Sequence, residues 1–149
     1  MLKRLVNRFF QGNKKQSIGK YIPEPGDERM RIAIIMARES FAEVAEKLKD
    51  GTIEMLSVKL MATNGRDNYY YWVIEVLKEE GTYSGIINNE DRRFKEIKMG
   101  ERIKFKETDI YDWMYEKDGK YFGNYTLKTM IYISNDQGQL EKLKNFGDI

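Results

Sequence analysis

The chain has 149 residues, a length typical of one domain that buries a sizeable core without disulfide bonds or bound metal. Its composition, 41% hydrophobic and 34% charged, is typical of a soluble globular protein. The absence of cysteine and histidine excludes disulfide bonds, thiolate and imidazole catalysis and the usual zinc or copper ligands. We therefore expect neither a cofactor nor a metal, and any catalysis would depend on carboxylate, lysine, tyrosine or arginine side chains.

The charge is unevenly distributed along the chain. Residues 1–20 contain six basic side chains and no acidic one, so the formal net charge of +2 leaves −4 for the remainder. A mildly acidic domain is not expected to bind nucleic acid. The longest aliphatic run, residues 32–37, is far too short to cross a bilayer, and the N-terminus lacks the pattern of a secretion signal. We predict a cytoplasmic protein with no transmembrane segment.

The first 20 residues form a separate basic tail. Its apolar residues lie three and four positions apart, on one face of a short helix: Leu2, Leu5, Val6, Phe9 and Phe10. Such a helix could make weak membrane-surface contact through residues 2–10 or dock into a partner, or the tail could pack loosely on its own domain or stay disordered. We divide the chain into this tail and a single α+β domain, residues 21–149.

The domain is predicted to begin with one long amphipathic helix. Pro23 and Pro25 keep the preceding segment extended, and Asp27 is suited to cap a helix N-terminus. Apolar residues then recur at helical spacing from Met30 to Leu48, and Gly51 supplies a stop.

Strands follow the helix. Alternating apolar residues predict strands at residues 56–62, 69–77, 82–87 and 101–106. The first strand directs Leu56, Val58, Leu60 and Ala62 to one face. In the second strand, we assign the inward face to Tyr70, Trp72, Ile74 and Val76.

The aromatic segment 109–126 closes the predicted sheet. We expect a single helical turn at residues 108–112, a strand from Trp113, and a hairpin turn at Asp118-Gly119, where both residues tolerate positive φ. Gly123 indicates a bulge or a close approach of the backbone.

The signals conflict at residues 127–134. The segment is rich in β-formers, yet Leu127, Met130 and Ile131 also fit one helix face; we assign a strand. Residues 139–146 are predicted to be a short polar helix or a frayed end. The resulting fold is α+β, with the long helix packed on a strongly bent antiparallel sheet, or a small SH3-like partial barrel, of five to six strands.

Seven residues are candidates for a ligand or partner site: Arg38, Trp72, Asn88, Asn89, Glu90, Asp112 and Trp113. Arg38, at the edge of the helical stripe, could hold a carboxylate ligand, although a structural pairing with Asp112 is the favoured interpretation. The Asn88-Asn89-Glu90 loop could bind a divalent cation, but its spacing does not fit a calcium loop, and turn closure by the asparagines is favoured.

The chain resembles the bacterial family known as domain of unknown function 2314. The residues that carry the resemblance are Ile22-Pro23, Asp27, Met30, Ala37-Arg38-Glu39-Ser40-Phe41, Val58-Lys59, Trp72-Val73, Gly85-Ile86-Ile87-Asn88-Asn89-Glu90, Gly100-Glu101, Ile110-Tyr111-Asp112-Trp113-Met114, Asp118-Gly119-Lys120, Gly123 and Thr126. The similarity spans about residues 22–133. Ser40 stands where members usually have Thr, and Asp91 where a Pro often follows. The resemblance implies a small α+β unit without an established reaction, cofactor or catalytic residue.

Two functional hypotheses follow. Two Trp and ten Tyr in a small domain favour a protein- or peptide-binding or regulatory module. Similar small domains occur near immunity proteins of bacterial toxin systems, so this hypothesis includes an immunity-like role. The alternative is a small-ligand-binding domain or enzyme, with Arg38, Glu90 and Asp112 around a pocket beside Trp113.

Overall fold

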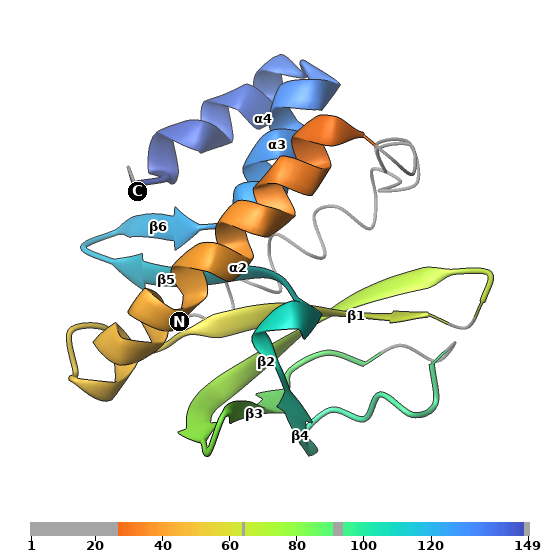
Figure 1. Ribbon diagram of the computed structural model, residues 1–149. Helices are drawn as coiled ribbons and strands as arrows, with labels where there is room; N and C mark the ends of the chain where they lie inside the picture. Colours follow the sequence, from red (N-terminus) through yellow and green to blue (C-terminus); the bar gives the residue numbers. More distant parts are fainter. Residues whose placement is uncertain (1–26, 64, 91–93, 148–149) are drawn as a thin grey trace.

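The computed structural model describes residues 27–63, 65–90 and 94–147. It confirms the α+β fold, with one long helix packed on an open six-stranded antiparallel sheet (Figure 1). The sheet order is β4-β3-β2-β1-β5-β6. The elements are α2 (Glu28–Lys49), β1 (Ser57–Thr63), β2 (Asn68–Glu79), β3 (Thr82–Ile87), β4 (Arg102–Phe105), the 3-10 turn η2 (Glu107–Asp109), β5 (Ile110–Lys117), β6 (Lys120–Gly123), α3 (Tyr125–Ser134), α4 (Gln137–Glu141) and the 3-10 turn η3 (Lys142–Asn145). The basic tail lies outside the described residues.

Helix α2 forms where the apolar spacing predicts it. The Asp27 carboxylate accepts a hydrogen bond from the Arg29 backbone N–H at 2.9 Å, which satisfies one of the free donors at the helix start. Its buried stripe is Met30, Ala33, Ala37, Phe41 and Val44. Gly51, with φ of 82°, follows the end of the helix.

The predicted strands are present, but the face assigned to β2 is wrong for three residues. Tyr69 and Val73 join the core beneath α2, whereas Trp72 and Ile74 are buried outside that core. Because side chains alternate along a strand, Tyr70 shares the face of Trp72 and Ile74. The prediction is right for Val76, which does join the core.

A β-bulge explains the change of face. Glu75 has φ of 52°, and the β2–β3 register shifts between Ile74 and Leu77. The extra residue turns the following side chains to the opposite face. In β1, where the alternation is regular, Val58 and Leu60 face the core as predicted, and so does Leu56 just before the strand.

The strand predicted at residues 127–134 is wrong, because this segment lies in helix α3. Asn124, with φ of 53°, turns the chain out of β6, and the buried Asp112 carboxylate binds the first backbone N–H groups of the helix. The short C-terminal helix is confirmed by α4 and η3. The turn before β5 is η2, and β5 begins at Ile110, inside the segment predicted as helical.

Trp113 lies at the centre of the core between α2 and the sheet. Its indole Nε1 donates to the Ala37 carbonyl and to Ser40 Oγ, both at 3.0 Å. The ring stacks on Tyr115 with centroids 5.8 Å apart and meets Tyr125 edge-on at 5.7 Å. Trp113 therefore joins α2 and the start of α3 to β5.

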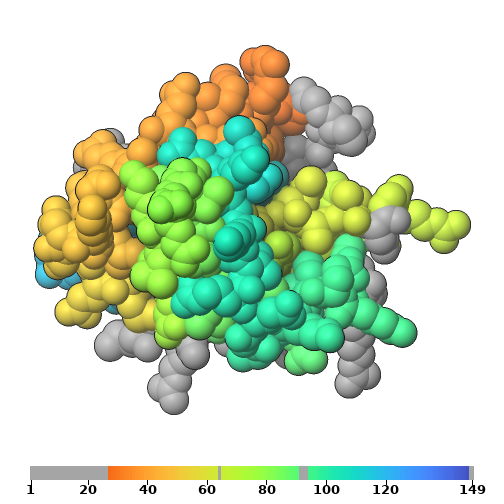
Figure 2. All heavy atoms as spheres, turned by 60° about the horizontal axis from the view of Figure 1, so that its bottom comes forward, coloured from red at the N-terminus to blue at the C-terminus, as the bar shows by residue number. Residues whose placement is uncertain are grey.

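The outline of the domain is uneven. The β1–β2 hairpin extends beyond the rest of the sheet, as the yellow-green tip at the right of Figures 1 and 2 shows. Among the described residues, no helix combines the length and apolar character needed to cross a bilayer.

Candidate functional site

A row of four side chains crosses the sheet on the face opposite α2. Asp112 pairs with Lys59 across β5 and β1, and Lys59 pairs with Trp72 across β1 and β2. Asn88 continues the row beyond β3, where its backbone N–H donates to the Trp72 carbonyl at 2.8 Å. We call Asp112, Lys59, Trp72 and Asn88 the polar row. It brings together three of the candidate residues predicted from the sequence.

Lys59 is the member of the polar row that the sequence did not single out. Its side chain lies on a central strand and is only 9% exposed. The amine lies 5.2 Å from the centroid of the Trp72 ring and 5.7 Å from that of Tyr111, as in a cation–π contact. Burial lowers the pKa of Lys59, and the nearby Asp112 carboxylate opposes this change.

Asp112 is fully buried and accepts four hydrogen bonds. The donors are the backbone N–H groups of Trp113, Tyr125 and Thr126, at 2.8, 3.1 and 2.8 Å, and the Thr126 hydroxyl at 2.5 Å. Burial raises the pKa of Asp112, while Lys59 and the bonds from Thr126 and Trp113 act in the opposite direction. The carboxylate thus fixes the N-terminus of α3 to β5.

Asn88 and Asn89 close the end of the β2–β3 ladder. The Asn89 side-chain oxygen accepts the Trp72 backbone N–H at 2.5 Å. Asn88 is buried, and its side-chain nitrogen has no hydrogen-bond partner. Glu90 is exposed at the end of this segment, and the described residues contain no cluster of three acidic side chains able to hold a metal ion. The Asn89 side chain thus makes the kind of turn-closing bond that the sequence favoured, whereas Asn88 contributes only its backbone N–H to the Trp72 carbonyl.

The pairing of Arg38 with Asp112 is wrong. Arg38 Nε donates to the Ile110 carbonyl at 2.7 Å, and Arg38 forms no ion pair with Asp112 in the described part of the chain. Arg38 approaches β5 from the α2 side, whereas Asp112 points to the other face and is saturated by its own donors. Arg38 and Asp112 therefore do not share a pocket, and Trp113 belongs to the core.

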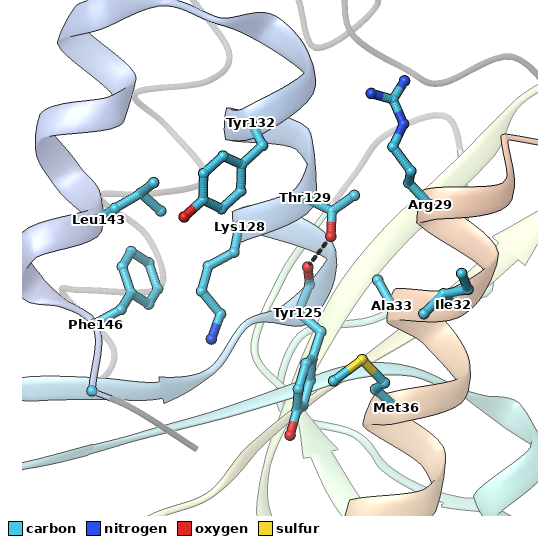
Figure 3. Close-up of a pocket in the computed structure, with 11 residues that line it drawn as sticks. Arg29, Ile32, Ala33, Met36, Tyr125, Lys128, Thr129, Tyr132, Leu143 and Phe146 are labelled. Carbon is cyan, nitrogen blue, oxygen red and sulfur yellow. Dashed lines mark hydrogen bonds between the residues drawn. The ribbon is translucent and has the colours of Figure 1, made fainter.

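An open groove between α2, α3 and η3 was not predicted from the sequence (Figure 3). It encloses about 460 Å³. Ile32 and Met36 face it from α2, and Tyr132 and Leu143 face it from the C-terminal helices. The signal was present in the sequence, because Ile32 and Met36 lie outside the buried stripe of α2.

Among the described residues that line the groove, the charged ones are the basic residues Arg29 and Lys128. Arg29 is paired with the Asp27 carboxylate at 3.1 Å. The Lys128 amine lies 5.3 Å from the Tyr125 ring centroid and 5.8 Å from that of Phe146. Figure 3 shows Lys128 between these two aromatic side chains, inside the groove.

A second groove separates the C-terminal half of α2 from the β2–β3 hairpin, where the orange and yellow helix meets the green strands in Figure 2. It also encloses about 460 Å³. Its lining contains acidic and basic residues in equal number: Glu46, Glu80, Lys49 and Lys78. Lys78 lies 3.9 Å from the Glu46 carboxylate, so charges within this groove offset one another.

These features define a small α+β domain that has one helix laid across an open sheet, a buried polar row and an open groove between α2, α3 and η3. The chain belongs to the DUF2314 family, described as an uncharacterized protein conserved in bacteria, whose model matches residues 27–147. It is similar to the uncharacterized protein YegJ of Escherichia coli strain K12, with 27% identity over 104 residues, 70% of this chain and 68% of that protein. No solved structure matches the chain significantly.

Proposed function

We propose that this domain is a protein- or peptide-binding module that uses the groove between α2, α3 and η3 as its docking surface. The observation that carries the proposal is the convergence of three exposed apolar side chains, with Ile32, Met36 and Tyr132 at 47%, 48% and 67% exposure. Single exposed apolar residues are ordinary, but a cluster around an open groove is typical of an interaction site.

The walls of the groove are held in place before any partner binds. Helix α2 is fixed by Phe41, which is fully buried, and by the Trp113 indole bonded to its backbone. Helix α3 is fixed at its N-terminus by Asp112. A groove between two fixed helices suits a peptide segment that inserts apolar side chains, and preorganised walls reduce the entropy lost on binding.

The cellular setting belongs to the same proposal. We place the domain in the cytoplasm, in agreement with the absence of cysteine. An immunity-like role is one form of this function, in which the docked protein is a toxin. Fractionation of cells that express the full chain tests the location, and recovery in the membrane pellet would contradict it.

The docking function is tested with a labelled amphipathic peptide that carries leucines on one helical face. Fluorescence anisotropy should show saturable binding to the full chain. Met36→Gln and Tyr132→Gln should each weaken binding by about tenfold, because each removes a large apolar contact. Met99→Gln is the matched control, since Met99 is exposed outside the groove and its replacement should change nothing. Equal weakening by Met36→Gln and Met99→Gln would contradict the assigned surface.

A specific observation favours small-ligand binding as a second candidate function. The Lys59 amine lies 5.2 Å from the centroid of the Trp72 ring, and the buried Asn88 side-chain nitrogen has no hydrogen-bond partner. Two buried donors beside an aromatic ring suit a small carboxylate ligand. Titration with benzoate, followed by tryptophan fluorescence, should then give saturable quenching that Lys59→Met abolishes. Quenching that is linear in benzoate would remove this candidate.

A further inference from the structure

We propose, resting on the small-carboxylate site that is the second candidate function above, that the ligand of this site is a small oxo acid and that the Lys59 amine forms an imine with its carbonyl group. Binding alone would leave the amine unchanged, whereas this reaction makes a covalent bond at Lys59 Nζ. The support comes from the surroundings of this amine and from the buried, unpartnered side-chain nitrogen of Asn88 in the same polar row.

The Lys59 amine lies in surroundings that favour its neutral, nucleophilic form. Its nitrogen is 5.2 Å from the centroid of the Trp72 ring and 5.7 Å from that of the Tyr111 ring. Burial lowers the pKa of Lys59, and the Asp112 carboxylate opposes this change but is the smaller effect. An ordinary lysine is neutral in roughly one molecule in 2,500 at pH 7, so any lowering of the pKa multiplies the fraction that can attack a carbonyl carbon.

Two titratable groups of β5, Asp112 and Tyr111, lie beside this amine. Burial raises the pKa of Tyr111, and Tyr70 of β2 acts in the same direction, so this phenol stays uncharged at neutral pH. Asp112 is fully buried and already accepts four hydrogen bonds, whereas Lys59 keeps 9% of its surface exposed. The lysine amine, on its flexible four-carbon stem, is therefore the group of the polar row that is suited to meet a small molecule.

Asn88 supplies a contact for the carboxylate of the ligand. It continues the polar row on the other side of Trp72, and its buried side-chain nitrogen has no hydrogen-bond partner. A buried donor without an acceptor is costly, and a carboxylate oxygen would satisfy it. Neighbouring strands lie about 4.8 Å apart, and the Lys59 amine extends over the Trp72 ring. The two donors therefore suit a molecule whose carbonyl and carboxylate groups are only a few bonds apart.

Imine formation here is balanced without an oxidant or a reductant. The neutral amine nitrogen bonds to the carbonyl carbon, and the π electrons of the C=O bond move to the oxygen, which takes up a proton. The C–O bond of this carbinolamine then breaks, and the oxygen leaves as water, which in the net reaction carries both hydrogens of the amine. The C=N product, when protonated, has the same positive charge as a protonated lysine, so the neighbouring Asp112 carboxylate remains its counter-ion.

Reductive trapping with glyoxylate tests this reaction. Glyoxylate is a small aldehyde that carries a carboxylate, and cyanoborohydride reduces its imine to a stable carboxymethyl amine. The full chain is treated at pH 7, and peptide mapping by mass spectrometry follows the labelling of each lysine. We expect Lys59 to be labelled at least roughly threefold faster than Lys104, an exposed lysine on the edge strand β4 that serves as the internal control. This preference should shrink towards pH 10, where ordinary lysines also lose their protons.

Two comparisons connect the labelling to the polar row. Benzoate should slow the labelling of Lys59 and leave that of Lys104 unchanged, because it competes for the contact with the ligand carboxylate. Asn88→Ala should slow the labelling of Lys59 by glyoxylate but not by acetaldehyde, which has no carboxylate. Because both aldehydes react with the same variant, a general loss of structure would change both rates and is thereby distinguished from loss of the contact.

The outcomes separate the imine from the binding site. If benzoate quenches tryptophan fluorescence saturably but Lys59 is labelled no faster than Lys104, the small-ligand site stands and the imine is overturned. If benzoate does not bind saturably and Lys59 shows no preference, both are overturned. If Lys59 is labelled preferentially, but equally fast by acetaldehyde and glyoxylate and equally fast in Asn88→Ala, an oxo acid is overturned as the ligand.

Discussion

Replacement of Asp112 by Ala tests the structural role of the polar row. The substitution removes the acceptor for the backbone N–H groups of Trp113, Tyr125 and Thr126 and for the Thr126 hydroxyl. It also leaves the Lys59 amine, 9% exposed, without its nearest opposite charge. The first turn of α3 would then lose its attachment to β5.

The magnitude follows from these contacts. A buried donor left without an acceptor costs about 1–3 kcal/mol, and this substitution takes the acceptor away from several buried donors at once. These costs overlap, because α3 can shift and admit water, so we expect Asp112→Ala to lower the free energy of unfolding by about 3–5 kcal/mol. Asp112→Asn keeps one acceptor oxygen and should lose less, about 1–3 kcal/mol.

Urea unfolding, followed by tryptophan fluorescence and circular dichroism, measures the effect. Asp118→Asn is the matched control: Asp118 lies in the exposed β5–β6 turn with φ of 52°, a conformation that Asn tolerates. The control should stay within about 0.5 kcal/mol of the wild type. A loss below about 1 kcal/mol for Asp112→Ala would refute the assigned role of this carboxylate.

Three further predictions follow from the core and its titratable groups. Lys59→Met should destabilise the protein less than Asp112→Ala, because the Asp112 carboxylate keeps its four hydrogen-bond donors. Urea unfolding should show a loss of about 0–2 kcal/mol in the free energy of unfolding. A larger loss would mean that the Lys59 amine has a further structural role. Gly123→Ala should prevent stable folding or cost at least about 3 kcal/mol, because a Cβ at this position, where φ is 81°, would overlap the Trp113 carbonyl and indole. Gly100→Ala is the control: φ is 90° there and the surrounding space is open, so this change should cost only about 1–2 kcal/mol. Burial raises the pKa of Tyr83 to about 12, above its usual value of 10. Unfolding therefore releases the Tyr83 proton as the pH rises from 10 towards 12, and the stability present below pH 10 is lost across that range. In Tyr83→Phe, the free energy of unfolding should fall less steeply between pH 10 and pH 12, by the slope that the release of about one proton produces. An unchanged slope would contradict this assignment.

Local rules were enough to predict most of the fold. The apolar spacing and cap of α2 and the regular alternation of β1 depend on neighbours in the chain, and both are confirmed. The close approach expected at Gly123 is confirmed by the space that the Trp113 side chain occupies there. The bulge at Glu75 could not be predicted, because nothing in the sequence around an ordinary Glu requires positive φ.

The features that the sequence did not predict depend on contacts between different elements of the fold. The segment 127–134 satisfies both periodicities. It lies in helix α3, whose first N–H groups, those of Tyr125 and Thr126, are bound by the Asp112 carboxylate of β5, a contact that the periodicity of the segment does not contain. Lys59 occupies an alternating polar position of β1, which by itself indicates a solvent-exposed side chain, and only the pairing of β1 with β2 and β5 places it between Trp72 and Asp112. Arg38 binds a backbone carbonyl, an acceptor present at every residue and therefore invisible in sequence patterns.

The most direct test of the groove as a docking surface is methyl NMR of the methionine-labelled full chain, titrated with the amphipathic peptide that carries leucines on one helical face. Met36 lines the groove, whereas Met55, Met61 and Met99 are exposed outside it and serve as internal controls. We predict a saturable shift of the Met36 methyl signal while the three control signals stay in place. Saturable shifts at Met61 or Met99 with Met36 unmoved would place the docking surface elsewhere and contradict the proposal.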